Sequence, residues 1–302
     1  MPFMGRRQSG AGGGSWIPVW RRICLIACTI LLTPTAAWPT AGWLYAGYMD
    51  VPRGEHGATL LPDGRLLLTG GYNTVNGYLA TAEIWDPNRG TFSFASNMPG
   101  MRSAHTATLI PDGRVLVVGG FSGSQALASA ELWDYTTNAW SSAGETGQVR
   151  AGHTATLLTD GRVLVVGGWC GTGCLVAGAM VWDPAASAWS SAGSLGSARY
   201  MHAATMLADG RVLVSGGRGA TGELASAEVW DPATESWSPA GSMAAGRFSH
   251  SATILPDGRV VASGGRTAGG TSRASAEIWD PASGTWASTG SLLVARESHA
   301  AV

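Results

Sequence analysis

Short runs of β-branched and apolar residues alternate with turn residues along the chain after residue 42. In one stretch, residues 106–110 and 114–118 form two such runs, separated by Pro-Asp-Gly. Pro fixes φ and Gly accepts a positive φ, so the three residues between the runs predict a tight turn and a β-hairpin. A third run covers residues 130–133 and a fourth surrounds Trp140. We therefore expect four short antiparallel strands in this unit.

The unit recurs with a period of 48 or 49 residues. Each copy begins with Arg-x-x-His, continues through Asp-Gly-Arg and Gly-Gly, and reaches Trp-Asp followed by a further aromatic residue. All six histidines of the sequence occupy this pattern: His56, His105, His153, His202, His250 and His299. Four short strands cannot bury both faces of their sheet alone, so the units must stack. Radial stacking predicts an all-β propeller of four-stranded antiparallel blades.

Five units are complete, and we expect the corresponding blades at approximately residues 53–101, 102–149, 150–198, 199–246 and 247–295. Trp43 stands ten residues before Arg53, where a fourth-strand aromatic residue is expected, and residues 296–302 match the start of a first strand. Residues 43–52 and 296–302 therefore predict an incomplete sixth blade in one propeller over residues 38–302, in a chain that ends early. A longer parent chain with six or seven blades is equally compatible with the pattern.

The N-terminal segment has the plan of a secretory signal. Four Arg residues precede an apolar run at residues 23–32, Pro34 closes that run, and small residues at 35–37 offer a cleavage site. The run is about half of the roughly 20 residues that a membrane-spanning helix needs. We expect a signal peptide at residues 1–37, no membrane span in the mature chain, and a protein that is secreted or held in the cell envelope. A signal retained as an anchor is the alternative.

Composition narrows the class of protein. Hydrophobic residues make up 45% of the 302 residues and charged residues 13%, a balance that excludes a disordered chain. The formal net charge is −1, and cleavage after residue 37 leaves 15 Arg against 20 acidic residues. We expect no nucleic-acid partner, because such binding requires a basic excess.

Two cysteines follow the predicted signal, Cys170 and Cys174, with Gly-Thr-Gly between them. In an oxidising compartment this spacing most simply indicates a local disulfide that closes a loop. Two cysteines without a nearby histidine do not indicate a zinc site.

The chain resembles the kelch-repeat family over residues 43–302. The resemblance rests on the Arg-x-x-His segment before the first strand, the Gly-Gly doublet, and two aromatic residues separated by six positions. Three departures are local: Tyr135 replaces a turn proline, Phe92 replaces a Trp, and Met180 replaces the Glu found at positions 83, 131, 228 and 277. The resemblance implies a propeller, in which we expect the repeated tryptophans to pack the blades.

The loops between Gly-Gly and Trp-Asp break the repeat, and we expect them to bind a ligand. In an antiparallel succession, the links from strand two to three and from strand four to one share a face. Aromatic and arginine side chains on exposed loops are the types that anchor binding. The candidate ligand-binding residues are Tyr72, Tyr78, Phe121, Trp169, Arg218, Arg266 and Arg273.

The repeated arginines allow two interpretations. They could form a positive ring at the channel mouth that attracts an acidic peptide or an anionic sugar. Alternatively, each pairs with a repeat acid such as Glu83 or Glu131 and closes its blade, which we favour because one Arg in each blade is what a structural repeat predicts. These arginines are Arg53, Arg102, Arg150, Arg199, Arg247 and Arg296. The six histidines could similarly surround a metal, but their regular repetition favours packing positions, and we expect no metal site.

Catalysis needs residues outside the repeat, and the sequence offers few. Kelch-type propellers include copper-radical oxidases similar to galactose oxidase, which need a Cys cross-linked to Tyr, a second Tyr and two His, and also a sialic acid mutarotase. Here the cysteines are better explained as a pair, and nothing in the sequence places two of the acid–base candidates Glu55, Glu145 and Glu297 together. We expect an exported, non-catalytic propeller that binds a protein or glycan and uses no cofactor. The alternative is a carbohydrate-active enzyme of one of these two kinds.

Overall fold

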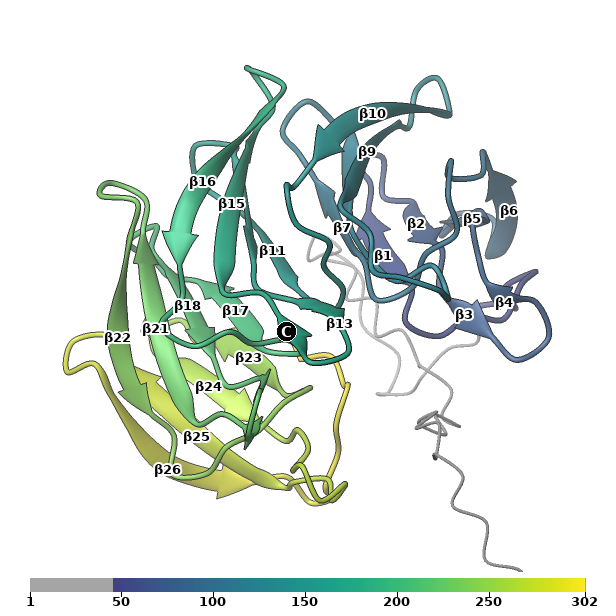
Figure 1. The fold of residues 1–302 in the computed structure, drawn as a ribbon. Helices are drawn as coiled ribbons and strands as arrows, with labels where there is room; N and C mark the ends of the chain where they lie inside the picture. Colours follow the sequence, from purple (N-terminus) through teal and green to yellow (C-terminus); the bar gives the residue numbers. More distant parts are fainter. Residues whose placement is uncertain (1–45, 302) are drawn as a thin grey trace, which may run out of the picture.

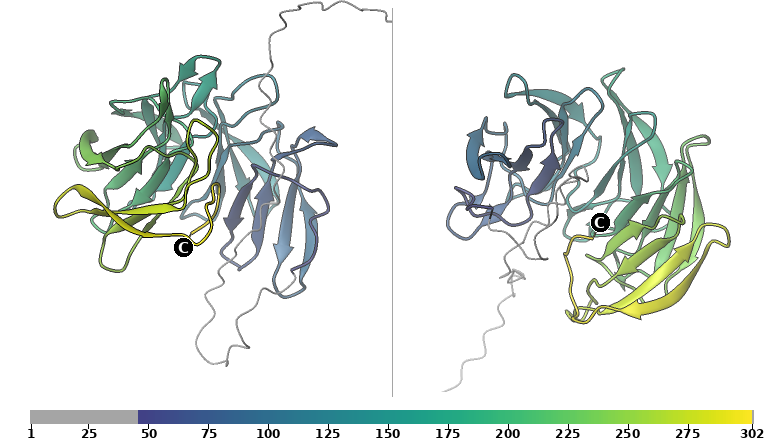
Figure 2. Two further views of the ribbon diagram at one scale, coloured as in Figure 1. Left: turned by 90° about the horizontal axis from the view of Figure 1, so that it is seen from below. Right: turned by 180° about the vertical axis from the view of Figure 1, so that it is seen from behind.

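The computed structural model describes residues 46–301, and every regular element in this range is a β-strand. Five four-stranded antiparallel sheets follow one another in chain order along an arc (Figure 1). We call these sheets blades 1 to 5. Blades 1 and 5 lie at the two ends of the arc, as the turned views in Figure 2 also show. The predicted all-β architecture of stacked, four-stranded antiparallel blades is confirmed.

Some predictions concern residues outside this range. The expected signal peptide at residues 1–37 and the aromatic residue Trp43 lie outside the described residues. Within residues 46–301, no helix is long and apolar enough to cross a membrane.

Each blade is a meander whose first strand lies on the inside of the arc and whose fourth strand lies on the outside (Figure 1). Blade 1 contains β1 (Gly57–Leu60), β2 (Leu66–Thr69), β5 (Ala82–Asp86) and β6 (Thr91–Ala95). Blade 2 contains β7 (Thr106–Leu109), β8 (Val115–Val118), β9 (Ser129–Asp134) and β10 (Ala139–Glu145). Blade 3 contains β11 (Thr154–Leu157), β12 (Val163–Val166), β15 (Gly178–Asp183) and β16 (Ala188–Ser194).

Blade 4 contains β17 (Ala203–Met206), β18 (Val212–Ser215), β21 (Ser226–Asp231) and β22 (Ser236–Ser242). Blade 5 contains β23 (Ser251–Ile254), β24 (Val260–Ser263), β25 (Ser275–Asp280) and β26 (Thr285–Ser291). Three two-stranded hairpins stand in the loops after Gly-Gly: β3 (Tyr72–Asn73) with β4 (Gly77–Tyr78), β13 (Trp169–Gly171) with β14 (Cys174–Leu175), and β19 (Arg218–Gly219) with β20 (Gly222–Glu223). The four strands predicted for residues 106–140 match blade 2.

Apolar side chains fill the space between neighbouring blades. Leu67 and Ile84 of blade 1 pack with Val117 and Trp133 of blade 2, and equivalent clusters join each later pair of blades. The third-strand tryptophans at these seams are buried: Trp133, Trp182, Trp230 and Trp279. A blade therefore completes its core only against its neighbour, which is why the units stack.

The outer end of each seam is closed by the fourth-strand indole. Its Nε1–H donates to a backbone carbonyl of the preceding blade over 2.7 to 3.1 Å. The four pairs are Trp140 with Ser96, Trp189 with Ala143, Trp237 with Ala192, and Trp286 with Ala240. These bonds satisfy the one polar group of a largely apolar side chain.

The inner end of each seam is closed by a chain of backbone hydrogen bonds. The residue just before each repeated His donates its N–H to the carbonyl of its counterpart in the preceding blade, at 2.8 or 2.9 Å. The chain runs through Ser298, Ser249, Met201, Gly152, Ala104 and Glu55. All six residues have φ between 49° and 62°. Because non-glycine residues rarely adopt this conformation, the packing around these residues holds them in it.

The first glycine of each doublet allows two blades to approach closely. A Cβ on Gly119 would lie 2.5 Å from the carbonyl oxygen of Arg150 in the next blade, and the φ of Gly119 is +57°. The second glycine, Gly120, donates its N–H to the same carbonyl at 2.8 Å. The same bond recurs at each doublet from Gly71 to Gly265. The doublet is therefore the junction between consecutive blades.

We predict that Gly119→Ala lowers the free energy of unfolding by about 3 kcal/mol, because it combines a left-handed backbone with a backbone clash. Gly90→Ala is the matched control. Gly90 has a φ of +65° but no atom within 4 Å of its added Cβ, so this variant should lose only about 1 kcal/mol. Urea denaturation of both variants measures the difference. Equal losses would show that blade contact does not require the doublet glycine.

Candidate ligand-binding face

The segment that carries each repeated Arg lies beside the loop that follows Gly-Gly in the same blade. The residue after the Arg forms a β-bridge with the first residue after the doublet. The five bridges are Gly54 with Tyr72, Ser103 with Phe121, Ala151 with Trp169, Tyr200 with Arg218, and Phe248 with Arg266. Five of the seven candidate binding residues therefore occupy equivalent positions in blades 1 to 5. We call the surface formed by these loops the loop face.

Four of the candidate residues form a continuous row of rings, which we call the aromatic row. The ring centroids of Tyr72 and Tyr78 are 5.0 Å apart, those of Tyr78 and Phe121 are 5.4 Å apart, and those of Phe121 and Trp169 are 5.4 Å apart. Tyr72 is 40% exposed, and the other three are partly exposed. The row therefore connects the loops of blades 1, 2 and 3 through edge-on and tilted contacts that aromatic pairs prefer.

A glycine makes room for the row between blades 1 and 2. A Cβ on Gly123 would lie 2.7 Å from the ring of Tyr78, and the φ of Gly123 is +96°. Tyr78 can therefore reach across from its own loop to Phe121 in the next one.

Arginines replace the aromatic residues in blades 4 and 5. The exposed Arg218 places its guanidinium carbon 5.8 Å from the ring centroid of Phe248, within the range of a cation–π contact. Arg266 pairs with Glu297 at 3.4 Å. Backbone hydrogen bonds lower the pKa of Glu223, and the charges of Arg273 and Arg218 lower it further. The loop face thus has an aromatic half and a half rich in charged side chains.

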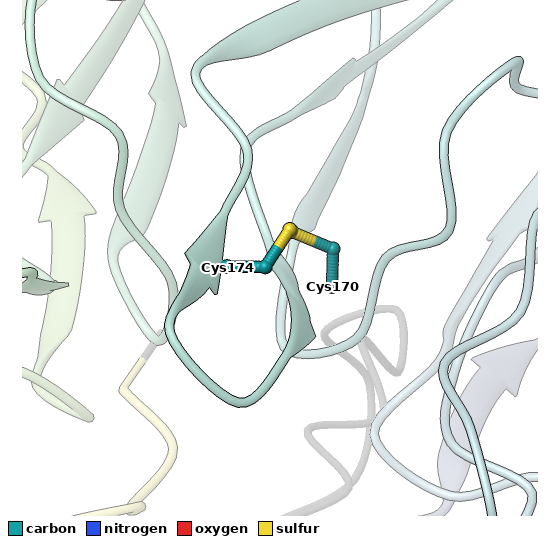
Figure 3. Close-up of a disulfide and its surroundings, with 2 residues drawn as sticks. All are labelled: Cys170 and Cys174. Carbon is teal, nitrogen blue, oxygen red and sulfur yellow. A yellow bond between two sulfur atoms is a disulfide. The ribbon is translucent and has the colours of Figure 1, made fainter.

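A disulfide closes the hairpin that carries Trp169. Cys170 lies in β13 and Cys174 in β14, with their Cα atoms 5.1 Å apart (Figure 3). The local disulfide predicted from the spacing is confirmed. It fixes the strand that begins with the last ring of the aromatic row.

The repeated arginines do not form a ring open to solvent. Arg53, Arg102, Arg150, Arg199 and Arg247 are each at most 6% exposed. In blades 1, 2, 4 and 5 the Arg Nη2 pairs with a third-strand glutamate: Arg53 with Glu83, Arg102 with Glu131, Arg199 with Glu228, and Arg247 with Glu277. Four of these buried arginines therefore pair with a glutamate of their own blade, as the second interpretation expects. Arg296 differs because it is exposed, and its Nε donates to the carbonyl of Val294 at 3.3 Å.

The repeated histidines lie in the seams between blades. The Nε2 of His105 is 2.8 Å from the hydroxyl of Thr69 in the preceding blade, and that of His202 is 2.8 Å from the hydroxyl of Thr154. His153, His250 and His299 make equivalent contacts with hydroxyl groups. Within residues 46–301, no three His, Cys, Asp or Glu side chains are grouped so that they could hold a metal ion. These hydroxyl contacts join neighbouring blades.

The three acid–base candidates lie in different contexts. Glu55 accepts a hydrogen bond from the hydroxyl of Ser103 at 3.2 Å. Glu145 is exposed at the end of β10. Glu297 pairs with Arg266, as described above. Glu55 and Glu297 therefore each have a local partner, whereas Glu145 faces solvent.

The comparisons with known proteins agree with this repeat. A family model described as the kelch motif matches residues 56–99, 102–146, 150–196 and 199–244. The chain belongs to the kelch-repeat family. No curated protein sequence matches the chain.

Two solved structures show that the kelch chain has a propeller-type fold. The first is a fungal alcohol oxidase of the AA5 family in complex with copper, with a TM-score of 0.69 at 19% sequence identity. The match covers 82% of this chain and 55% of the oxidase, so this chain spans about half of that protein's length. The second is the protein YjhT, with a TM-score of 0.66 at 16% identity, covering 82% of this chain and 87% of YjhT. At these identities the likeness concerns the fold alone.

Phe248 is buried beside the loop face, where it forms a β-bridge with Arg266, and it is not among the residues predicted from the sequence. It directly follows the repeated Arg247, and this position changes from blade to blade, from Gly54 to Tyr200 and Phe248. That variation was the available signal. The contact of Phe248 with Arg218 joins two blades, so the residue pattern of a single repeat does not reveal it.

Burial of the seam histidines predicts that the protein is sensitive to acid. Burial, reinforced by the nearby arginines, lowers the pKa of His56 to about 4 and that of His105, His202 and His250 to about 3. In the unfolded chain the same groups bind protons below pH 6.5. The unfolded state therefore takes up more protons between pH 6.5 and 4, and stability falls as the pH falls through this window.

At pH 5 each fully buried histidine should reduce the free energy of unfolding by about 2 kcal/mol relative to a high-pH reference. Urea midpoints measured at pH 7 and pH 5 test this expectation. His105→Gln should make the dependence on pH shallower, because one titrating group is removed. An unchanged urea midpoint between the two pH values would contradict it.

Proposed function

We propose that this protein is an exported, non-catalytic kelch propeller that binds a protein or glycan ligand through its loop face. The observation that carries the proposal is the aromatic row, in which four rings from three blades stand 5.0 to 5.4 Å apart. Aromatic and Arg side chains dominate the energetics of binding surfaces. The row and Arg218 supply both types on one face.

The contacts that hold these loops support a binding role. The hairpins β3–β4 and β13–β14, the β-bridges to the Arg segments, and the Cys170–Cys174 disulfide hold the rings before any ligand arrives. A surface held in its binding conformation loses less conformational entropy on association, which increases affinity.

Export is part of the proposal. Disulfides form and persist mainly in oxidising compartments, and the Cys170–Cys174 bond fits such a compartment. The signal peptide expected at residues 1–37 would deliver the chain there.

The copper-oxidase alternative finds no support in the described residues. Oxidases of that kind use a Cys joined to Tyr together with two His, but Cys170 and Cys174 are joined to each other. The repeated histidines contact hydroxyl groups in separate seams. The donor set therefore does not fit a copper-radical centre.

We predict that Trp169→Ala and Arg218→Ala each weaken ligand binding at least about tenfold, because each removes an anchor of the loop face. The purified chain is screened on glycan and protein arrays, and Kd values are then measured for the ligand found. Arg114→Ala is the matched control: Arg114 pairs with Asp112 in an exposed turn before β8. Unchanged affinity in both loop-face variants would contradict the proposal. So would loss of affinity in the control alone.

A further inference from the structure

Arg150 of blade 3 lacks the carboxylate that its counterparts have. Position 180 on β15 is Met, and in the sheet register Met180 faces Val165 just as Glu131 faces Val117 in blade 2. In blade 2 the Arg102 Nη2 lies 2.5 Å from Glu131. The replacement of Glu by Met therefore removes the charge partner of Arg150 without changing the strand that carried it.

A second partner is also missing in blade 3. In the other blades the Arg Nη2 donates to a hydroxyl at the start of the third strand or just before it, over 3.1 to 3.3 Å. These hydroxyls belong to Thr81, Ser129, Ser226 and Ser275. The equivalent residue in blade 3 is Gly178. Arg150 keeps only the bonds from Nη1 to the carbonyls of Gly167 and Gly178, at 3.1 and 3.2 Å, and its Nη2 has no hydrogen-bond partner among the described residues.

The charge of Arg150 is nevertheless buried. The residue is 1% exposed, and burial lowers its pKa to about 10. Arg150 therefore remains a cation at neutral pH. A buried charge without a partner is strongly unfavourable, so an anion that reached it would be bound well.

The glutamates of the other blades show how an anion is held at this position. In blade 4 the Glu228 carboxylate bridges the Arg199 Nη2 at 2.7 Å and the backbone N–H of Gly196 at 2.7 Å. In blade 5, Glu277 accepts the N–H of Ala244 at 2.6 Å in the same way. The donor stands three residues before the Arg in both blades, and in blade 3 this position is Gly147.

The three residues that define this position in blade 3 line one pocket. Arg150, Gly147 and Met180 border a pocket of about 440 Å³ that Leu175 and Val176 also line. This volume is within the range of small-molecule sites. Met180 is partly exposed, and its unbranched side chain can move aside for a ligand and pack against it.

We propose that this pocket binds a small carboxylic acid, whose carboxylate takes the place of the missing glutamate between the Nη2 of Arg150 and the N–H of Gly147. A carboxylate is the anion that this position holds in the other four blades, where a glutamate supplies it, and a carboxylate pairs well with a guanidinium. The apolar part of the acid lies against Leu175 and Val176. The proposal does not depend on the aromatic row, which lies on other residues.

The test measures the Tm of the purified chain with sodium acetate, sodium butyrate or sodium phosphate, against sodium chloride at equal ionic strength. We expect both carboxylates to raise the Tm by roughly 3–5 °C at about ten times their Kd. Phosphate should have no effect beyond that of chloride. The proposal would be overturned if acetate raised the Tm no more than chloride does, or if phosphate raised the Tm as much as acetate does.

Met180→Glu supplies the missing carboxylate from the chain itself. This variant should have a higher Tm than the natural chain without ligand, and carboxylates should no longer raise it. Met180→Leu is the matched control, because it keeps an apolar side chain and should keep the response. A full response to acetate in Met180→Glu would show that the carboxylates bind elsewhere.

A variant in another blade tests the same chemistry independently of position 180. Glu228→Met leaves Arg199 without its carboxylate, as in blade 3. Its Tm should be lower than that of the natural chain, and acetate should raise it by a larger amount than in the natural chain. An acetate response no larger than that of the natural chain would contradict the proposed anion position.

Discussion

The repeated arginine joins each blade to the one before it, and most of the structure depends on this contact. Its backbone forms hydrogen bonds with the preceding blade: the carbonyl of Arg102 accepts the N–H of Gly71, and the N–H of Arg102 donates to the carbonyl of Leu79. Its side chain forms hydrogen bonds within its own blade, where Nη1 donates to the carbonyl of Gly119 at 3.0 Å. The first position of each doublet requires glycine, because a Cβ there would collide with the backbone of this arginine.

The remaining seam contacts follow from this spacing. With the backbones of two blades fixed at the doublet, the buried histidine reaches a hydroxyl of the preceding blade, the third-strand Trp fills the middle of the seam, and the fourth-strand indole closes the outside. Polar groups therefore lie at both ends of an apolar seam. Each of these contacts joins two neighbouring blades, so stability is divided among local interfaces as in other repeat proteins.

This division explains where the chain can vary. The loops after Gly-Gly and the residues directly after the repeated arginines lie outside the apolar clusters of the seams, and they differ between blades. Rings gather in blades 1 to 3, and arginines occupy the same position in blades 4 and 5. Blade 3 has Met180 in place of the glutamate and still forms its four strands, because each of the other arginine–glutamate pairs lies within its own blade. Repeated positions thus hold the scaffold, and departures from the repeat lie where we propose that ligands bind.

Periodicity, turn residues and cysteine spacing predicted the repeating unit, its strands and the Cys170–Cys174 disulfide, because these features depend on residues close together along the chain. The sequence also allowed the pairing of the arginines with the glutamates, but it could not exclude an arginine ring. Only the tertiary structure decided that these arginines are buried, that Tyr78 meets Phe121 across two blades, and that Met180 leaves a pocket beside Arg150. The physical reason is that these contacts join residues from different strands or blades, and their distances depend on how the blades pack.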